Sequence, residues 1–300
     1  RLLGTVNFSR LLSGELDEAL STSQQLLVMA RANKNLYTEA WSYYLRGLYH
    51  LARNQLEEAR RHFQLAVEKR YVLHTRVAVD SMAGLALTNA VLGDSGQADA
   101  ALALLLEFAT ATENLLYVAI ARTCQARVLL LNGQPVAAAQ LLQSVLLESD
   151  VGILFYFLEI PRLTECRVLV GQKDRGQVLD GVRKLATLSQ ANQAMHNVCQ
   201  QIEIEVLQTI GYRRLNRDKE ARAALDRAIE LAEPRGWIRP FIEPGQPMAD
   251  ILRSVLPTHP QRAFIVQPLA EFPEARAIAA STRPSSTRRR ARPKARSAPA

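Results

Sequence analysis

The clearest candidates for ligand binding are an aromatic group and two arginines. Four aromatic residues lie close together in the sequence: Trp41, Tyr43, Tyr44 and Tyr49. On a helix, Trp41 falls on an apolar stripe and is expected in the core, whereas Tyr43 lies roughly 200° further round and is expected to face outward. Arg46 and Arg122 would accompany Tyr43 if their helices are equivalent parts of a repeat. Tyr43, Arg46 and Arg122 are therefore our candidates for a ligand or partner surface, while ordinary core or solvated side chains remain the favoured interpretation.

Metal-binding and catalytic patterns are weak in this sequence. His196 and Cys199 have i, i+3 spacing and would share a helix face, but two ligands do not make a metal site. A buried thiol beside a partly exposed histidine is the favoured interpretation. No Ser/His/Asp or Cys/His set is recognisable, and acids such as Asp17 and Glu57 stand at helix starts, where the helix dipole favours them. We expect no catalytic residue, no metal site and no cofactor in this chain.

The elements that position these residues are indicated by an internal repeat. The repeated unit is an apolar helix, a short turn and a second helix with a small apolar residue near its start. This unit recurs at steps of 40, 39, 41, 39 and 43 residues. The small residues that mark the copies are Ala19, Ala59, Ala98, Ala139, Val178 and Ala221.

Each copy reads as two antiparallel helices. In the second copy, apolar residues recur at helical spacing on both sides of a turn at Asn54. Glycine or asparagine in these turns suits the left-handed residue that ends a helix, and the small residue permits close helix approach. The sequence predicts an all-α fold: a right-handed superhelix, or α-solenoid, of about six antiparallel hairpins of roughly 40 residues with a C-terminal helical cap. Its concave inner surface would bind ligands.

Composition changes near the C-terminus define three predicted regions: a tetratricopeptide-like array at 1–233 with a truncated first repeat, a capping segment at 234–275, and a basic disordered tail or linker at 276–300. The segment 234–245 is rich in helix breakers and aromatic residues, and a short helix begins near Pro247. These residues would cover the open apolar end of the stack.

The net charge of +8 is concentrated in the tail. Residues 281–300 hold seven of the 37 basic residues and no acid, which leaves 30 basic against 29 acidic residues elsewhere. A linker, a frame-altered terminus, a solvated tail and a nucleic-acid-binding tail all remain open for this segment. No run of eighteen apolar residues predicts a membrane span, and three widely separated cysteines fit a reducing cytoplasm.

The residues after the last repeat resemble a known protein family. The family pattern here is a glycine, an aromatic residue, V-R, F, an acid, a glycine and P-M. This chain has Gly236-Trp237-Ile238-Arg239-Pro240-Phe241, then Glu243, Gly245 and Pro247-Met248. Together with repeats longer than the standard tetratricopeptide length, this segment is similar to the helical-repeat region of the MalT-like, large ATP-binding LuxR-family transcriptional regulators.

The resemblance implies a non-catalytic sensor that binds a small-molecule inducer or a regulatory protein on its concave face. Neither the phosphate-binding Gly-Lys-Ser/Thr loop of that family's ATPase nor its helix-turn-helix phrase occurs in this sequence. DNA would therefore be bound only through a module outside this chain. The alternative is a free-standing tetratricopeptide-like scaffold for protein–protein interaction.

Overall fold

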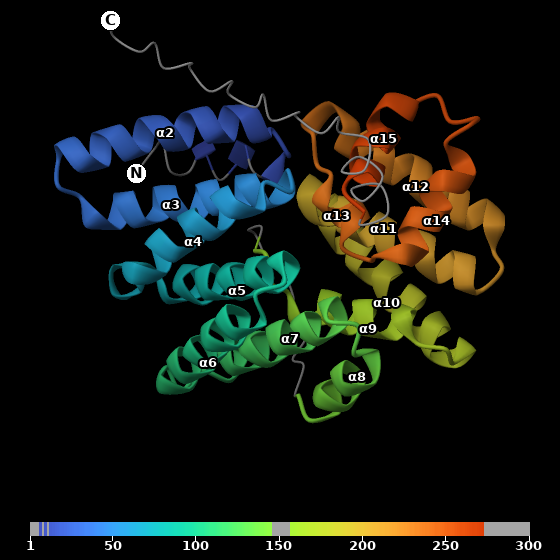
Figure 1. The fold of residues 1–300 in the computed structure, drawn as a ribbon, viewed down its shortest axis with the longest axis horizontal. Helices are drawn as coiled ribbons and strands as arrows, with labels where there is room; N and C mark the ends of the chain where they lie inside the picture. The colour runs from blue at the N-terminus through green and yellow to red at the C-terminus, as the bar shows by residue number, and fades with distance from the viewer. Residues whose placement is uncertain (1–5, 8, 11, 146–156, 273–300) are drawn as a thin grey trace, which may run out of the picture.

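The described part of the chain is entirely helical. A computed structural model describes residues 6–145, except 8 and 11, and residues 157–272. Within these ranges it contains fourteen α-helices and no strand. Consecutive helices pack antiparallel, and the hairpins follow one another along a curved stack (Figure 1). The prediction of an all-α solenoid is confirmed.

The second helices of the hairpins repeat at an even step. They are α2 (Leu16–Ala32), α4 (Leu56–Glu68), α6 (Ser95–Ala111), α8 (Pro135–Gln143), α10 (Arg175–Ala194) and α12 (Asp218–Ala232). The first helices alternate with them: α3 (Leu36–Ala52), α5 (Thr75–Leu92), α7 (Leu115–Leu131), α9 (Pro161–Gly171) and α11 (Val198–Arg214). Each first helix also packs against the next first helix. The first helices therefore form one continuous layer.

Five of the six turns that lead into a second helix share one backbone conformation, as the sequence predicts. The residue two positions before a second helix has a positive φ of 57° to 80° in five copies: Gly14, Asn54, Gly93, Gly133 and Asn216. Only glycine and asparagine occupy these positions, because a left-handed backbone crowds most side chains.

The repeated small residue lies at the helix contact in every copy. Five of the predicted positions are at most 5% exposed: Ala19, Ala59, Ala98, Val178 and Ala221. In the fourth copy the prediction of Ala139 is wrong by one residue. Ala138, which is 0% exposed, is the fourth residue of α8 and takes the equivalent place. A run of three alanines made the two positions indistinguishable by residue type.

Glycines allow the closest approach in the second and third hairpins. Phe63 of α4 is fully buried between α3 and α5. A Cβ atom at either Gly47 or Gly84 would lie 2.6 Å from its ring. The two missing side chains therefore make the space that the phenyl ring fills.

Three short helices follow the last repeat: α13 (Arg239–Ile242), α14 (Gln246–Val255) and α15 (Arg262–Ala270). They pack beside α11 and α12 (Figure 1). His259 lies 3.0 Å from Asp226 of α12, and Phe241 stacks edge-on to Phe264 at 5.4 Å. The segment thus covers the last repeat, while residues 276–300 lie outside the described part of the chain.

The same segment also reaches the first hairpins. The backbone N–H of Ile238 donates to the carbonyl of Ala52 at 3.1 Å. Asn54 donates to Glu271 at 2.8 Å, and Arg235 donates to the carbonyl of Ser13 at 2.8 Å. The two ends of the solenoid are therefore in contact, which the prediction of a simple end cap did not include.

Candidate functional site

Tyr43 lies between the two layers of helices. It is 4% exposed. Its hydroxyl accepts a hydrogen bond from Arg31 Nη2 at 2.8 Å and donates to Glu39 Oε1 at 2.8 Å. Its ring lies 6.2 Å from the ring of His62 on α4. The expectation that Tyr43 faces outward is therefore wrong, because α2 and α4 flank α3 on this side and cover it.

Arg46 points toward the same two second helices. Its Nε donates to His62 Nε2 at 3.3 Å, and its Nη1 contacts Gln24 of α2. Arg122 belongs to α7 and donates to Gln125 at 3.3 Å. The structure therefore brings Tyr43 and Arg46 together around His62 and places Arg122 elsewhere. A ligand-binding role for these three residues stays a prediction.

Two other aromatic residues of α3, Trp41 and Tyr44, lie on the side of the helix that faces the layer of first helices. Trp41 is partly buried and packs edge-on against Tyr44 at 5.8 Å, which confirms its expected place in the core. Tyr44 is fully buried and donates from its hydroxyl to Asp80 Oδ2 at 2.7 Å. Asp80 belongs to a larger group of buried charges.

Eight charged side chains form a connected cluster, here called the inner charge cluster. They come from α5, α7, α9, α11, α13, the residue that follows α13 and the segment before α9. The members of the cluster are Arg76, Asp80, Arg127, Glu159, Arg167, Glu203, Arg239 and Glu243, each with a side chain at most 14% exposed. Four cations balance four anions. Buried charges of this kind are rare in proteins unless they are paired.

Arg127 is the centre of this cluster. Its Nε and Nη2 form a two-pronged contact with the carboxylate of Glu243 at 2.6 and 2.8 Å. Its Nη1 reaches Glu159 Oε2 at 3.3 Å and the carbonyl of Leu158 at 2.8 Å. Burial, the largest single effect, would lower the pKa of Arg127, but the carboxylates of Glu243, Glu159 and Glu203 together raise this pKa well above its ordinary value. Arg127 therefore stays charged and joins α7, the 158–159 segment and α13.

Glu243 is held ionised by the surrounding arginines. Burial would raise its pKa, but Arg127, and more weakly Arg167 and Arg239, hold the pKa of this carboxyl well below its usual range. Glu203, in contrast, pairs with Arg167, yet burial outweighs that pairing and raises the pKa of Glu203. The two carboxyl groups thus differ in how easily they take up a proton.

Asp80 fixes the chain just before α9. Its two carboxylate oxygens accept hydrogen bonds from the backbone N–H groups of Leu158 and Glu159 at 2.9 and 3.1 Å. Arg76 pairs with Asp80 at 3.2 Å and donates to the carbonyl of Glu159 at 2.8 Å. These contacts satisfy buried backbone groups in a segment that has no helical partner for them.

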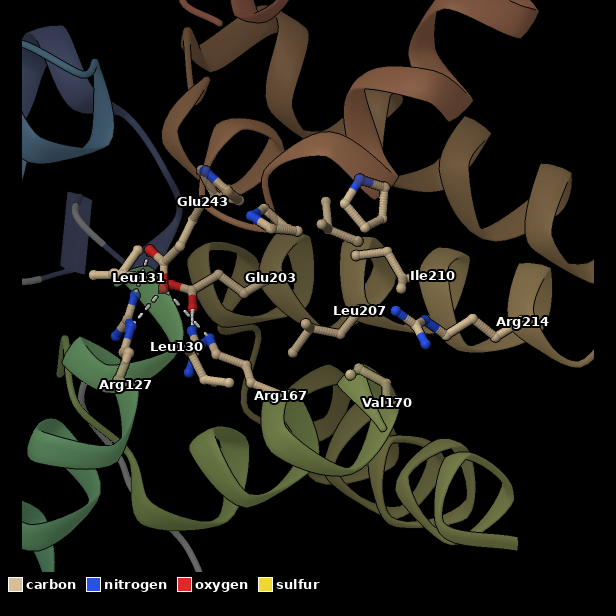
Figure 2. A pocket seen from close by; sticks show the side chains of 15 residues that line it. Arg127, Leu130, Leu131, Arg167, Val170, Glu203, Leu207, Ile210, Arg214 and Glu243 are labelled. Carbon is tan, nitrogen blue, oxygen red and sulfur yellow. Dashed lines mark hydrogen bonds and ion pairs between the residues drawn. The ribbon is translucent and has the colours of Figure 1, made fainter. Parts of the chain in front are cut away.

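A pocket of about 160 Å³ opens beside the cluster. Arg127, Arg167, Glu203 and Glu243 line one end, and Arg214 lies at the other (Figure 2). Apolar side chains line much of the rest of the pocket: Leu130, Leu131, Val170, Val206, Leu207 and Ile210. Small-molecule sites typically combine apolar walls with a few placed polar groups.

The pocket residues were missed by the sequence analysis. Glu203 stands between Ile202 and Ile204, and Arg127 stands between Ala126 and Val128. A charged residue with an apolar residue on each side inside a helix is the signal that could have found them, because apolar neighbours on both sides indicate a buried stretch of helix. The prediction relied on the angle between Trp41 and Tyr43 around their helix. It selected the face of α3 that packs against α2 and α4, which is not the face near the pocket.

His196 and Cys199 do not form a shared site. His196 is exposed and has a positive φ of 53° in the turn before α11. Cys199 is fully buried, with its sulfur 3.7 Å from the carbonyl of Leu12. Burial raises the pKa of the Cys199 thiol well above its ordinary value. This agrees with the interpretation of a buried thiol beside an exposed histidine.

A comparison with known protein families identifies the same repeats and capping segment. The family model of the MalT-like TPR region matches residues 5–258 of this chain. No curated protein is significantly similar to it. None of the helices in the described ranges is long and apolar enough to cross a membrane. The match spans the repeats and most of the closing segment, so the chain belongs to the MalT-like TPR family and is a regulatory helical-repeat region.

Proposed function

We propose that this chain is the sensor region of a LuxR-family, ATP-dependent transcriptional regulator in the bacterial cytoplasm. The match to the MalT-like TPR region supports this proposal. Repeat arrays of this type bind partners or ligands on extended surfaces and are typically non-catalytic. We therefore propose no reaction for it and assign ATP and DNA binding to other modules of the regulator.

The observation that carries the proposal is the pocket beside the inner charge cluster. The inner charge cluster has equal numbers of cations and anions, so the lining of the pocket has only the single excess positive charge of Arg214 to attract an ion. Its guanidinium and carboxylate groups can still donate and accept hydrogen bonds. The pocket therefore favours a small polar inducer without a large net charge, held by polar groups at one end and by apolar walls along its length.

The location of the pocket supports a role in signalling. It is lined by α7, α9 and α11 from three repeats and by Pro240 and Glu243 from α13 and its end. The segment just before α13 bonds to Ala52 of α3 through Ile238. If α13 can adopt two placements, a ligand that binds more tightly to one of them would favour that placement. The contact between the two ends of the solenoid would then change with it.

A thermal-shift screen of the chain against metabolites tests this function. A ligand at about 100 times its dissociation constant adds about 2.7 kcal/mol of stability. Each 1 kcal/mol raises the midpoint by roughly 2–4 °C in domains of about 150–250 residues, so a shift of roughly 5–10 °C is expected.

Two variants then locate the ligand. Arg214→Ala changes the open end of the pocket, where Arg214 is exposed and donates to the carbonyl of Gln172. Arg122→Ala changes the surface that the sequence predicts. We expect Arg214→Ala to weaken the ligand shift and Arg122→Ala to leave it intact. The reverse result would place the ligand outside the pocket, and no shift with any metabolite would count against an inducer site.

The alternative function, a protein–protein interaction scaffold, is favoured by a different surface. Large apolar side chains are exposed beside the turns that lead into α3, α5 and α7: Leu36, Tyr37, Tyr71, Val72 and Leu115. These turns follow one another along one edge of the solenoid (Figure 1). Exposed apolar patches often mark protein contacts. If Tyr71→Ser abolished binding of a partner protein while the metabolite screen stayed negative, the scaffold would be the better description.

A further inference from the structure

Two buried histidines and a glutamate meet in the second hairpin, away from the pocket. His50 lies on α3, and Glu58 and His62 lie one turn apart on α4. One potential ligand atom of each residue lies within 4.8 Å of those of the other two. Among the described residues this is the one group of three that could hold a metal ion. His50 and His62 are 8% and 3% exposed, whereas Glu58 reaches the surface.

The tautomer of His50 is set by its neighbour. Its Nδ1 lies 2.7 Å from Oε1 of Gln55. An amide oxygen only accepts hydrogen bonds, so Nδ1 carries the proton and Nε2 keeps a lone pair. His50 Nε2 is buried and has no hydrogen-bond partner. Metal-binding histidines commonly show this arrangement, in which the second nitrogen donates to an oxygen and orients the ring.

His62 presents a lone pair to the same region. Its Nε2 accepts a hydrogen bond from Arg46 Nε at 3.3 Å and lies 3.8 Å from Glu58 Oε2. Its Nδ1 is buried without a partner. The rings of His50 and His62 are 5.2 Å apart.

Without a metal ion, the buried Nε2 atom of His50 stays unsatisfied. Buried polar groups without partners are uncommon, and each one calls for a reason. Two imidazoles and a carboxylate are a ligand set that suits Zn²⁺, with water completing the shell on the exposed side of Glu58.

We propose that His50, Glu58 and His62 bind a divalent transition-metal ion of the Zn²⁺ type. The donor atoms, which lie within 4.8 Å of one another, must close to about 3.3 Å, the separation that tetrahedral bonds of about 2.0–2.1 Å require. Arg46 must release His62 Nε2, and Glu58 must exchange part of its contact with Arg61. Both arginines are long side chains that reach the surface, so they can move without disturbing the core.

The competition with Arg46 makes the proposal testable. Arg46 supplies both a positive charge and a hydrogen bond that a bound cation must displace. Removing it should strengthen metal binding, which a structural role for the histidines would not predict. Removing the carboxylate of Glu58 should weaken binding.

The experiment titrates the metal-free 300-residue chain with ZnCl₂ in competition with a chromophoric chelator. Wild type should bind one equivalent. Glu58→Gln should lower the affinity at least roughly tenfold, as loss of even an outer-shell partner often does. Arg46→Met should raise it. Co²⁺ in place of Zn²⁺ should give the strong visible absorption of a tetrahedral site, reduced in Glu58→Gln.

His196→Gln is the matched control, because His196 and Cys199 have a spacing that can suit a metal but do not form a shared site. It should leave the affinity unchanged. Glu58 and Arg46 both reach the surface, so circular dichroism of their variants should match wild type and any change in affinity reports on the site. Absence of Zn²⁺ binding, loss of binding in His196→Gln, or equal affinity in wild type and Glu58→Gln would each overturn the proposal.

Discussion

Arg127→Met tests whether the inner charge cluster is held together by one arginine. Arg127 contacts both Glu159 and Glu243, and its side chain is 4% exposed. Methionine fills much of the same space but offers no donor. The substitution therefore leaves two buried carboxylates without their shared partner, and it also removes the donor to the carbonyl of Leu158.

The magnitude follows from what remains around these acids. Removing one partner of a buried ion pair costs about 3–5 kcal/mol, because the remaining charge stays desolvated. Glu243 keeps Arg167 at 3.7 Å and Arg239 at 3.8 Å. We therefore expect a loss near the lower end, about 3 kcal/mol. At roughly 2–4 °C per kcal/mol, the thermal midpoint should fall by roughly 6–12 °C.

Urea unfolding followed by circular dichroism, together with calorimetry, measures this loss. Arg122→Met is the matched control on the same helix, because Arg122 is partly exposed and donates to Gln125 rather than to a buried carboxylate. It should change stability by less than about 0.5 kcal/mol. Combining Arg127→Met with Glu243→Gln should cost less than the sum of the single changes. Equal effects of the Arg127 and Arg122 changes, or strict additivity with Glu243→Gln, would refute the reasoning.

Two further predictions concern packing and pH. Gly84→Ala should lower the free energy of unfolding by about 1–3 kcal/mol, because its Cβ would meet the Phe63 ring at 2.6 Å. Gly96→Ala, which meets no atom within 4 Å, should be neutral or slightly stabilising in the same urea assay. Glu243 has a pKa lowered from its ordinary 4.5, so the stabilisation from its charge is complete above that pH and lost as the pH falls below it. The difference in unfolding free energy between wild type and Glu243→Gln should therefore shrink at acidic pH, and a difference that grows would contradict this sign.

Much of the fold is predictable because its causes are local. Helix periodicity, the small residue after each turn and the left-handed glycine or asparagine all act within about forty residues. The error at Ala139 shows the limit of this reasoning. Where Ala138 and its neighbours are identical, local chemistry does not choose the register, and packing against the adjacent helix decides which one is buried.

The candidate site is harder to predict because it depends on several repeats at once. The spacing of Trp41 and Tyr43 correctly places them on different faces of α3. This spacing does not show which of the two faces of α3 is covered by the neighbouring second helices, α2 and α4. Tyr43 faces α2 and α4, while Tyr44 points toward Asp80 of α5.

The sequence by itself determined the helical repeats, their turns, their family resemblance and the capping segment, because these follow from periodicity and from backbone preferences of single residues. Only the tertiary structure decided that the capping segment returns to the first hairpins. It also brought Arg127, Arg167, Glu203 and Glu243 into one cluster from four different helices and their ends. The physical reason is that a buried charge needs a partner of opposite sign, and here that partner is supplied by a distant part of the chain.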